Sequence, residues 1–326
     1  MRAVVAERHG GPDVLTETDR PDPRPGPGEL LVRLTAAGIN YKDVYEREGR
    51  AALRAPFVPG SEGAGTVLAT GADVTGFRPG DRVAWCAAPA SYAELVAVPA
   101  GAAVRVPDDI PDTDAAATML QGLTAHYLTT STYRAAPGET ALVHSAAGGL
   151  GQHLVRLLVR RGARVIGTVS APAKAAAAEA AGAHHVIVRG GEPDELTRRV
   201  LDHTDGRGAD VVYDGIGRDT FEAGLAALRP RGTFVLVGAA SGPVPPFDPQ
   251  SLAPRGSLFL TRPTLVDHAS DPEELTARAA DVFRWLREGV LKTAIGGRYG
   301  FDRAAEAHAD LQSGTTTGKL LLQSGH

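Results

Sequence analysis

The sequence predicts an α/β protein in which a mostly β region is followed by a doubly wound parallel sheet, and three observations support this fold class. Before about residue 112, short apolar runs alternate with Gly and Pro, as in β domains with irregular loops. From there on, strand-like and helix-like segments alternate, which is typical of a parallel sheet with helices on both faces. A Gly-rich turn follows the first strand of this alternation. The length of 326 residues allows about two domains.

Strands of the mostly β region are expected where apolar runs have the length of a strand. These runs cover residues 30–34, 65–68, 82–85 and 94–98, and turn signals rich in Pro and Gly stand at 25–28 and 78–81. A helix capped by Asp112 or Thr113 is expected to follow and to run toward Tyr127.

The alternating region is expected to form six strands and four intervening helices. The predicted strands are 140–144, 164–168, 185–188, 209–213, 233–237 and 257–260. The predicted helices are 149–161, 171–181, 195–203 and 221–228. After Pro263 we expect one long helix at 272–288 and a Gly-rich end. This end is too short for a domain of its own, so it should pack on the N-terminal region.

Composition excludes several classes of protein. A hydrophobic content of 43% with 22% charged residues indicates an ordinary globular core. The formal net charge is -4 and no run of Lys or Arg exceeds two residues, so neither a nucleic-acid groove nor an anionic membrane surface is expected. The chain has no apolar stretch of about 18 residues, and Glu7 comes too early for a signal peptide. Cys86 is the one cysteine, which excludes an intrachain disulfide and a cysteine-cluster zinc site. We expect a cytoplasmic protein.

The sharpest site signal is the Gly-rich turn at residues 145–151. It follows a predicted strand and opens a predicted helix, as the dinucleotide fingerprint requires. Gly148 would let the backbone approach a pyrophosphate, and Gly151 would let the helix pack closely on the sheet. The amides of Gly149 and Leu150 would then face the phosphates at the positive end of the helix. The alternative is a purely structural turn between strand and helix.

The region after the second predicted strand favours NADP over NAD. An NAD site places Asp or Glu about 20 residues beyond the turn, on the ribose 2′-hydroxyl. Here no acidic residue occurs until Glu179, while Ser170 and Lys174 could bind a 2′-phosphate. Arg189, just after the third strand, could reach the same phosphate. The alternative for Lys174 and Arg189 is that both are solvated surface residues.

Several ordered motifs together resemble one known family. They occupy residues 9–15, 37–43, 59–65, 79–83, 121–125, 146–151, 213–219 and 261–263, and so extend over nearly the whole chain. The chain resembles the zinc-independent quinone oxidoreductases of the zeta-crystallin type, in the medium-chain dehydrogenase/reductase superfamily.

This resemblance implies a GroES-like catalytic domain at residues 1–122 and 264–326, a Rossmann NADPH-binding domain at 123–263, and a cleft between them. Zinc-containing relatives have Cys at the position of Asn40 and His at that of Ser61. Without those ligands zinc has no inner coordination shell, so we expect no metal. A homodimer formed through the strand near residues 257–260 is also expected from the family.

The resemblance also implies the site residues. Asn40 and Tyr45 are the expected catalytic residues. The expected cofactor-binding residues are Asn40, Tyr41, Asp43, Tyr45, Gln121, Tyr127, Gly148, Gly149, Leu150, Gly151, Ser170, Lys174, Arg189, Ile216, Gly238, Ala239, Ala240, Ser241, Phe259, Leu260, Thr261 and Arg262. Close relatives often have Tyr at position 189 and Lys at position 121. Arg189 should keep the affinity for the 2′-phosphate by its charge, whereas the role of Gln121 is left open.

The activity implied is hydride transfer from NADPH to a quinone. The reduced quinone is a delocalised anion, so water or Tyr45 could protonate it without a dedicated general acid. Tyr45 could instead be an aromatic wall of the pocket, and Asn40 is expected to position the substrate. One alternative is an NADPH-dependent enone or enoyl-thioester reductase, in which a proton donor matters more. Another is an NADPH-binding structural or RNA-binding protein, against which the lack of a basic stripe counts.

Overall fold

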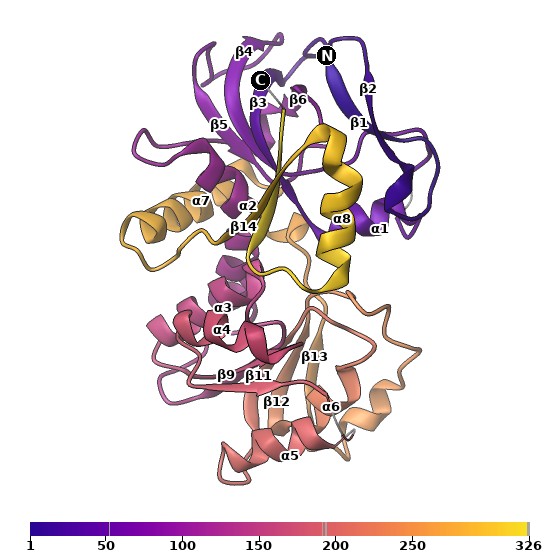
Figure 1. Cartoon of the computed structure of the whole chain (residues 1–326). Coiled ribbons are helices and arrows are strands. Elements are labelled where there is room, and N and C mark those ends of the chain that lie inside the picture. The colour runs from indigo at the N-terminus through magenta and orange to yellow at the C-terminus, as the bar shows by residue number, and fades with distance from the viewer. Residues whose placement is uncertain (52, 191, 193, 325–326) are drawn as a thin grey trace. The chain divides into compact units, whose positions relative to one another are not determined.

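The computed structural model describes residues 1–51, 53–190, 192 and 194–324, which form two compact units (Figure 1). Unit 1 consists of Met1–Leu123, His268–Gly289 and Thr293–His326. Unit 2 consists of Thr124–Asp267 and Val290–Lys292. The α/β fold class with a mostly β region and a doubly wound sheet is confirmed. No helix within the described part of the chain has the length and apolar character needed to cross a membrane.

Unit 1 is built on a sheet whose centre is β3 (Glu29–Ile39). The other strands of this sheet are β4 (Gly63–Thr70), β5 (Arg82–Trp85), β6 (Leu95–Pro99), β7 (Ala103–Arg105), β14 (Ile295–Gly300) and β15 (Lys319–Gln323). They are ordered β14-β15-β3-β4-β5-β7, with β6 paired to β3. In β3, Leu30, Val32 and Leu34 are buried and alternate with more exposed residues, which is the two-residue period of a strand. A separate ladder joins β1 (Arg2–Ala6) to β2 (Leu15–Asp19).

The C-terminal end of the chain returns to this sheet. Residues Leu320, Leu321 and Leu322 of β15 pair antiparallel with the end of β3. The α-helices of unit 1 are α1 (Tyr41–Arg47), most of α2 (Asp112–Tyr127), α7 (Pro272–Arg287) and α8 (Ala304–Ser313). Short 3-10 helices of unit 1 lie at Pro12–Val14, Ala100–Ala102 and Phe301–Arg303, and a further one, Val266–His268, spans the boundary between the two units in the chain. Helix α8 was not predicted from the sequence, where the segment was assigned to a Gly-rich end.

The predicted cap of α2 is wrong. The helix begins at Asp112, so neither Asp112 nor Thr113 precedes it, and the N–H groups of Asp114 and Ala115 donate to the carbonyl of Pro111. The Asp112 carboxylate instead accepts hydrogen bonds from Arg82 and from the Thr35 hydroxyl. An ionic partner on the sheet therefore replaced the local capping interaction expected from the sequence.

Unit 2 contains a parallel sheet in the order β10-β9-β8-β11-β12-β13. Its strands are β8 (Thr140–Val143), β9 (Arg164–Val169), β10 (His185–Val188), β11 (Ala209–Asp214), β12 (Leu228–Leu236) and β13 (Phe259–Thr261). The chain runs outward from β8 to β10 and then returns to the other side of β8. The carboxyl ends of β8 and β11 therefore form a topological switch point, where ligands bind in open α/β sheets.

Helices cover both faces of this sheet. Figure 1 shows α3 (Gly149–Arg160) with α4 (Ala175–Ala180) on one face and α5 (Glu195–Asp202) with α6 (Phe221–Ala226) on the other. The predicted helix at 171–181 is shorter than expected, because Pro172–Lys174 form a 3-10 turn before α4. The helix predicted at 221–228 ends at Ala226, because Leu228 already starts β12. A π-helical turn at Leu128–Thr132 and a 3-10 helix at Pro249–Leu252 complete the helical elements of the described residues.

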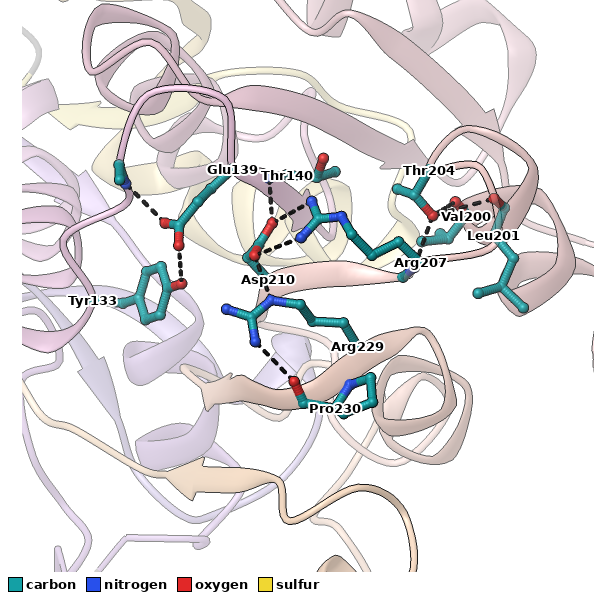
Figure 2. Close-up of polar contacts among 12 residues, drawn as sticks. Tyr133, Glu139, Thr140, Val200, Leu201, Thr204, Arg207, Asp210, Arg229 and Pro230 are labelled. Atoms are coloured by element: carbon teal, nitrogen blue, oxygen red, sulfur yellow. Dashed lines mark hydrogen bonds and ion pairs between the residues drawn. The ribbon is translucent and has the colours of Figure 1, made fainter.

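A buried carboxylate holds the amino ends of three strands together (Figure 2). Asp210, 2% exposed, accepts two hydrogen bonds from Arg207, at 2.9 and 2.8 Å, and one from Arg229 Nε at 2.5 Å. It also accepts the backbone N–H of Thr140 at 2.7 Å. Burial opposes the charge, but the two arginines hold the pKa of Asp210 below its usual value. The network joins β8, β11 and β12, and so fixes where their carboxyl ends emerge.

Candidate functional site

The Gly-rich turn folds tightly between β8 and α3. Ser145 adopts a left-handed conformation with φ 53°, and its carbonyl accepts the Gly148 N–H at 2.9 Å. A Cβ on Gly151 would lie 2.2 Å from the Ser145 oxygen and 2.8 Å from Cα of Ala146. Only Gly permits this contact between helix and turn. The role predicted for Gly151 in close packing therefore agrees with the local geometry.

The first turn of α3 has the features of a helix start that can bind an anion. An α-helix leaves its first N–H groups without partners inside the helix and carries a partial positive charge there. Helix α3 has twelve residues and no acidic residue in its first turn, and its first residues, Gly149 and Leu150, are half-buried. This end of the helix lies at the switch point, so backbone amides can receive a phosphate group.

Two loops at the carboxyl ends of β11 and β12 are bonded to each other. The carbonyl of Ile216 accepts both the N–H and the hydroxyl of Ser241, each at 2.9 Å. Asp214 Oδ1 accepts the N–H groups of Ile216 at 2.7 Å and Gly217 at 3.1 Å. The structure thus brings Ile216 together with the expected residues Gly238, Ala239, Ala240 and Ser241.

Three polar residues gather at the carboxyl ends of the neighbouring strands β9 and β10. Ser170 follows β9 and is exposed, Lys174 ends the next 3-10 turn, and Arg189 follows β10 with its N–H on the carbonyl of Val169 at 2.8 Å. Burial and then the charge of Arg189 lower the pKa of Lys174. Burial also lowers the pKa of Arg189, and its buried Nε has no hydrogen-bond partner among the described residues. A bound dianion would favour the charged form of both residues, which burial disfavours.

The other expected residues of unit 2 lie on its linking helix and on its edge strand. Tyr127 is 1% exposed, and burial raises its pKa to about 12, an effect that Arg262 opposes. Phe259 on β13 is 61% exposed, whereas Leu260 and Thr261 are half-buried and Arg262 is exposed. The charge of Arg262 thus acts on Tyr127, although the two residues are far apart in the sequence.

In unit 1, the side-chain amide of Asn40 is buried, and both its oxygen and its nitrogen are hydrogen-bonded. Its Oδ1 accepts Lys319 Nζ at 2.7 Å, and its Nδ2 donates to Glu62 Oε2 at 2.8 Å and to the carbonyl of Gly38 at 3.2 Å. Lysine only donates and a carboxylate only accepts, so the orientation of the amide is unambiguous. With an exposure of 6%, Asn40 is held in place with both Nδ2 hydrogens already used.

The partners of Asn40 form a buried ion pair that the sequence reasoning missed. Glu62, 0% exposed, lies just before β4, and Lys319, 2% exposed, lies on β15. Lys319 donates to Glu62 Oε2, while the backbone N–H of Leu120 in α2 donates to Oε1 at 2.6 Å. The available signal was the presence of single charges beside otherwise apolar strand residues, since such charges are rarely buried without a partner.

Asp43 also lies beneath the surface, where it contacts protein and not solvent. Its Oδ2 accepts the backbone N–H of Asn40 and the hydroxyl of Tyr92, each at 2.8 Å. Burial, followed by the charge of Glu46, raises the pKa of Asp43 to about 7. Neither Tyr92 nor its neighbour His308 was expected from the sequence as part of the site.

The aromatic residues of α1 and Gln121 are the more accessible members of the expected set in unit 1. Tyr41 and Tyr45 are half-buried, with ring centroids 6.2 Å apart, and Cζ of Arg50 lies 4.1 Å from the centroid of the Tyr45 ring. The Tyr41 hydroxyl donates to the carbonyl of Leu311 at 3.2 Å. Gln121 is half-buried on α2, and its Oε1 has no hydrogen-bond partner among the described residues.

Metal-binding side chains do not cluster in the described ranges. Nowhere in them do three or more His, Cys, Asp or Glu side chains come together as a metal site would need. At the two positions where zinc-containing relatives place ligands, Asn40 binds Lys319 and Glu62, and Ser61 Oγ is buried without a partner among the described residues. An amide bonded to an ammonium offers no ligand to zinc.

Comparison with known proteins gives concordant matches. The family model of the alcohol dehydrogenase GroES-like domain matches residues 26–108, and that of the zinc-binding dehydrogenases matches residues 149–277. A quinone oxidoreductase of Pseudomonas aeruginosa is 43% identical over 318 residues, or 96% of this chain and 97% of that protein. A 2-haloacrylate reductase of a Burkholderia species is 37% identical over 330 residues, or 99% and 98%. A mycobacterial protein solved with NADPH is 44% identical, with a TM-score of 0.97 and coverage of 99% and 100%.

The buried pair of Glu62 and Lys319 makes a first prediction. Lys319→Met leaves the Glu62 charge buried without its counterion, so the free energy of unfolding should fall by roughly 3–5 kcal/mol. The double variant with Glu62→Gln keeps an acceptor for Leu120 and removes the charge, so it should cost less than the sum of the single variants. Urea unfolding of the four proteins measures this cycle. Additive costs, or a loss below about 1 kcal/mol for Lys319→Met, would contradict a coupled buried pair.

Proposed function

This chain belongs to the zeta-crystallin-like quinone oxidoreductase family of the medium-chain dehydrogenase/reductase superfamily, and we propose on that basis that it reduces a quinone with NADPH. The observation that carries the proposal is the combination found in unit 2. An amide-lined turn leads into α3, Ser170 and Lys174 follow β9 where an NAD site would have a carboxylate, and Arg189 follows the neighbouring strand β10.

The residues of unit 2 fit NADPH from one end to the other. We infer that Gly148, Gly149, Leu150 and Gly151 bind the pyrophosphate, since they form the start of α3, where the backbone N–H groups have no partners within the helix and no acidic side chain is present. Ser170, Lys174 and Arg189 bind the 2′-phosphate through a hydroxyl and two charges. The remaining contacts come from Tyr127, Ile216, Gly238, Ala239, Ala240, Ser241, Phe259, Leu260, Thr261 and Arg262.

When bound, NADPH supplies the hydride, and the chain's own residues bind and orient the reactants. We propose that Tyr45 faces the acceptor, with Tyr41 beside it and Asn40, Asp43 and Gln121 in support. A reduced quinone is a stabilised anion, so water or the Tyr45 hydroxyl can deliver its proton without a strong acid. This mode of action requires no metal.

We also propose which residues form the catalytic domain and which form the NADPH-binding domain. Residues 1–122 and 264–326 would form the GroES-like catalytic domain, and residues 123–263 the Rossmann NADPH-binding domain. The GroES-like family model, at residues 26–108, lies within the first range, and the dehydrogenase model, at 149–277, covers most of the second and extends 14 residues beyond it. We further propose a cytoplasmic location, in keeping with a single buried thiol, Cys86, whose pKa burial raises to about 12.

The acceptor class is tested with a panel of quinones, enones and enoyl-CoA thioesters, following the loss of NADPH absorbance. Quinones should turn over fastest. Tyr45→Phe should reduce quinone turnover only a few-fold, because the product anion is stable, but should lower enone turnover roughly 100-fold or more. A preference for enones would favour the alternative function, an enone or enoyl-thioester reductase, which the similarity to a 2-haloacrylate reductase supports. NADPH binding without any turnover would favour a binding protein instead.

The 2′-phosphate site is tested by removing its charges one at a time. Lys174→Ala and Arg189→Ala should each weaken NADPH binding by roughly 10- to 100-fold, the worth of one charge-assisted hydrogen bond. Binding of NADH, which lacks the phosphate, should change little. Arg198→Ala on α5 removes an exposed charge elsewhere in unit 2 and serves as the control. Equal losses for NADPH and NADH, measured by fluorescence titration, would argue against this site.

We also propose that the chain forms a homodimer through β13. This strand ends the sheet of unit 2, and it exposes 61% of Phe259, so pairing with a second copy would cover both an open edge and an apolar side chain. Light scattering should give a dimer mass, and Phe259→Asp should shift it toward the monomer. Val266→Asp changes another exposed apolar residue, 64% exposed, and should leave the mass unchanged. A monomeric wild-type protein would refute the proposal.

A further inference from the structure

A chain of buried polar contacts connects Asp43, near the start of α1, with Arg47 at its end, through Tyr92 and His308, which have no part in the proposed reaction. Asp43 Oδ2 accepts the Tyr92 hydroxyl at 2.8 Å, and this hydroxyl lies 3.2 Å from Nε2 of His308. His308 Nδ1 lies 3.2 Å from Nη1 of Arg47. All four side chains are 0% exposed. The contacts run from the first turn of α1, through the loop before β6 and α8, and back to the last residue of α1.

The direction of every hydrogen bond in this chain is determined. A guanidinium only donates, so His308 Nδ1 accepts from Arg47. Burial and the charge of Arg47 lower the pKa of His308 to about 3, so the ring is neutral and its proton is on Nε2. Nε2 therefore donates to the Tyr92 oxygen, and the Tyr92 hydrogen is left to donate to Asp43. The order of donors and acceptors makes Asp43 the acceptor at the end of the chain.

These contacts hold a helix too short to be stable alone. Helix α1 has seven residues, and isolated helices below about 12 residues are marginal in water. At its start, the N–H of Asn40 donates to Asp43 Oδ2 at 2.8 Å. At its end, Arg47 Nη2 donates to Gln312 at 2.8 Å. The position of α1, and with it that of Tyr45, thus depends on contacts with Tyr92 and α8.

We propose that Asp43 is a positioning residue whose carboxylate, by holding the Asn40 N–H and the Tyr92 hydroxyl, fixes the helix that presents Tyr45 to the acceptor, and that proton uptake by this carboxylate loosens the helix. The inference rests on the proposed role of α1 at the acceptor site. A charged acceptor binds N–H and O–H donors more strongly than a neutral one, and negative charge at a helix start is favourable. The ionised form therefore holds α1 more tightly.

The surroundings of Asp43 make proton uptake possible near neutral pH. Burial raises its pKa to about 7 and Glu46 on α1 adds to this, while Lys42 on α1, Tyr92 and the Asn40 N–H oppose it. Beyond Tyr92, the charge of Glu62 also acts on that hydroxyl, His308 is neutral, and Arg47 bonds to the far side of His308. Asp43 Oδ1 is buried without a partner among the described residues, so a proton can sit there without displacing the bonds to Oδ2.

Ionisation of Asp43 lowers the stability of the folded protein although it holds α1 more tightly. The pKa of the Asp43 carboxyl group is about 4 in the unfolded chain and about 7 in the folded protein. The protonated group therefore stabilises the fold fully below about pH 4, and this contribution is lost as the pH rises through about 7. The folded protein should therefore become less stable as the pH rises from about 4 to about 7, while α1 becomes better held as the pH passes about 7. Loss of the same proton thus lowers the stability measured without ligand and raises the turnover measured with quinone.

The experiment compares the full-length wild-type protein with Asp43→Asn, Glu46→Gln and Tyr92→Phe. Urea unfolding without ligand and kcat for a quinone are measured over the same pH range. In the wild type, stability should fall with rising pH and level off near pH 7, the pH at which kcat should rise several-fold. Asp43→Asn should remove the step from both curves. Glu46→Gln removes a like charge and should move the midpoint to lower pH, whereas Tyr92→Phe removes a donor and should move it to higher pH, each by roughly 0.5–1 unit.

Opposite shifts from two neighbouring variants are not expected of a purely structural role. Asp302→Asn, which removes an exposed carboxylate in unit 1, should leave both curves unchanged. A step that persists in Asp43→Asn, or shifts in the same direction in the other two variants, would overturn the inference. If Asp43→Asn fails to fold, the opposite midpoint shifts of Glu46→Gln and Tyr92→Phe still test the inference. Absence of quinone turnover in the wild type would refute the proposed function and with it the kinetic role, while the unfolding curves would still show whether Asp43 titrates.

Discussion

The buried carboxylate of Glu62 is the interaction on which unit 1 depends. It accepts Lys319 from β15, the amide of Asn40 from the end of β3, and the backbone N–H of Leu120 from α2. A carboxylate at 0% exposure is tolerated only when such partners compensate for lost hydration. Gly38 shows how tightly the group is enclosed, because a Cβ there would lie 2.2 Å from Glu62 Oε2. Three segments distant in sequence are therefore fixed by one charge.

Unit 2 uses carboxylates for a related purpose at the two ends of β11. At the amino end, Asp210 binds Arg207 and Arg229 and ties three strands together (Figure 2). At the carboxyl end, Asp214 accepts two loop N–H groups and the Thr220 hydroxyl at 2.8 Å. The first network joins the amino ends of three strands and the second bonds the loop after β11, so β11 carries a buried carboxylate network at each end.

Sequence patterns predicted the parts of this structure that depend on local periodicity. The strand at His185–Val188 was predicted at its observed bounds, and the Gly-rich turn was placed correctly because strand, turn and helix are adjacent in sequence. The pairing of Glu62 with Lys319 was not predictable in this way, because 257 residues separate the partners. Helix α8 was missed since its buried face consists of Ala304, Ala307 and His308, and not of large apolar residues. The burial of Asp43 likewise follows from Tyr92 and His308, which no local motif connects to it.

The state of Asn40 constrains the chemistry that this fold can support. Both hydrogens of its amide donate to Glu62 and Gly38, and its oxygen accepts from Lys319, so no hydrogen remains to activate an acceptor without breaking the network. A polar group fully used inside the protein stabilises geometry and cannot also stabilise developing charge on a substrate. Reactions that need a strong hydrogen-bond donor or acid are therefore poorly served at this position. Hydride transfer to a quinone does not need one, because the product anion is delocalised over its own ring.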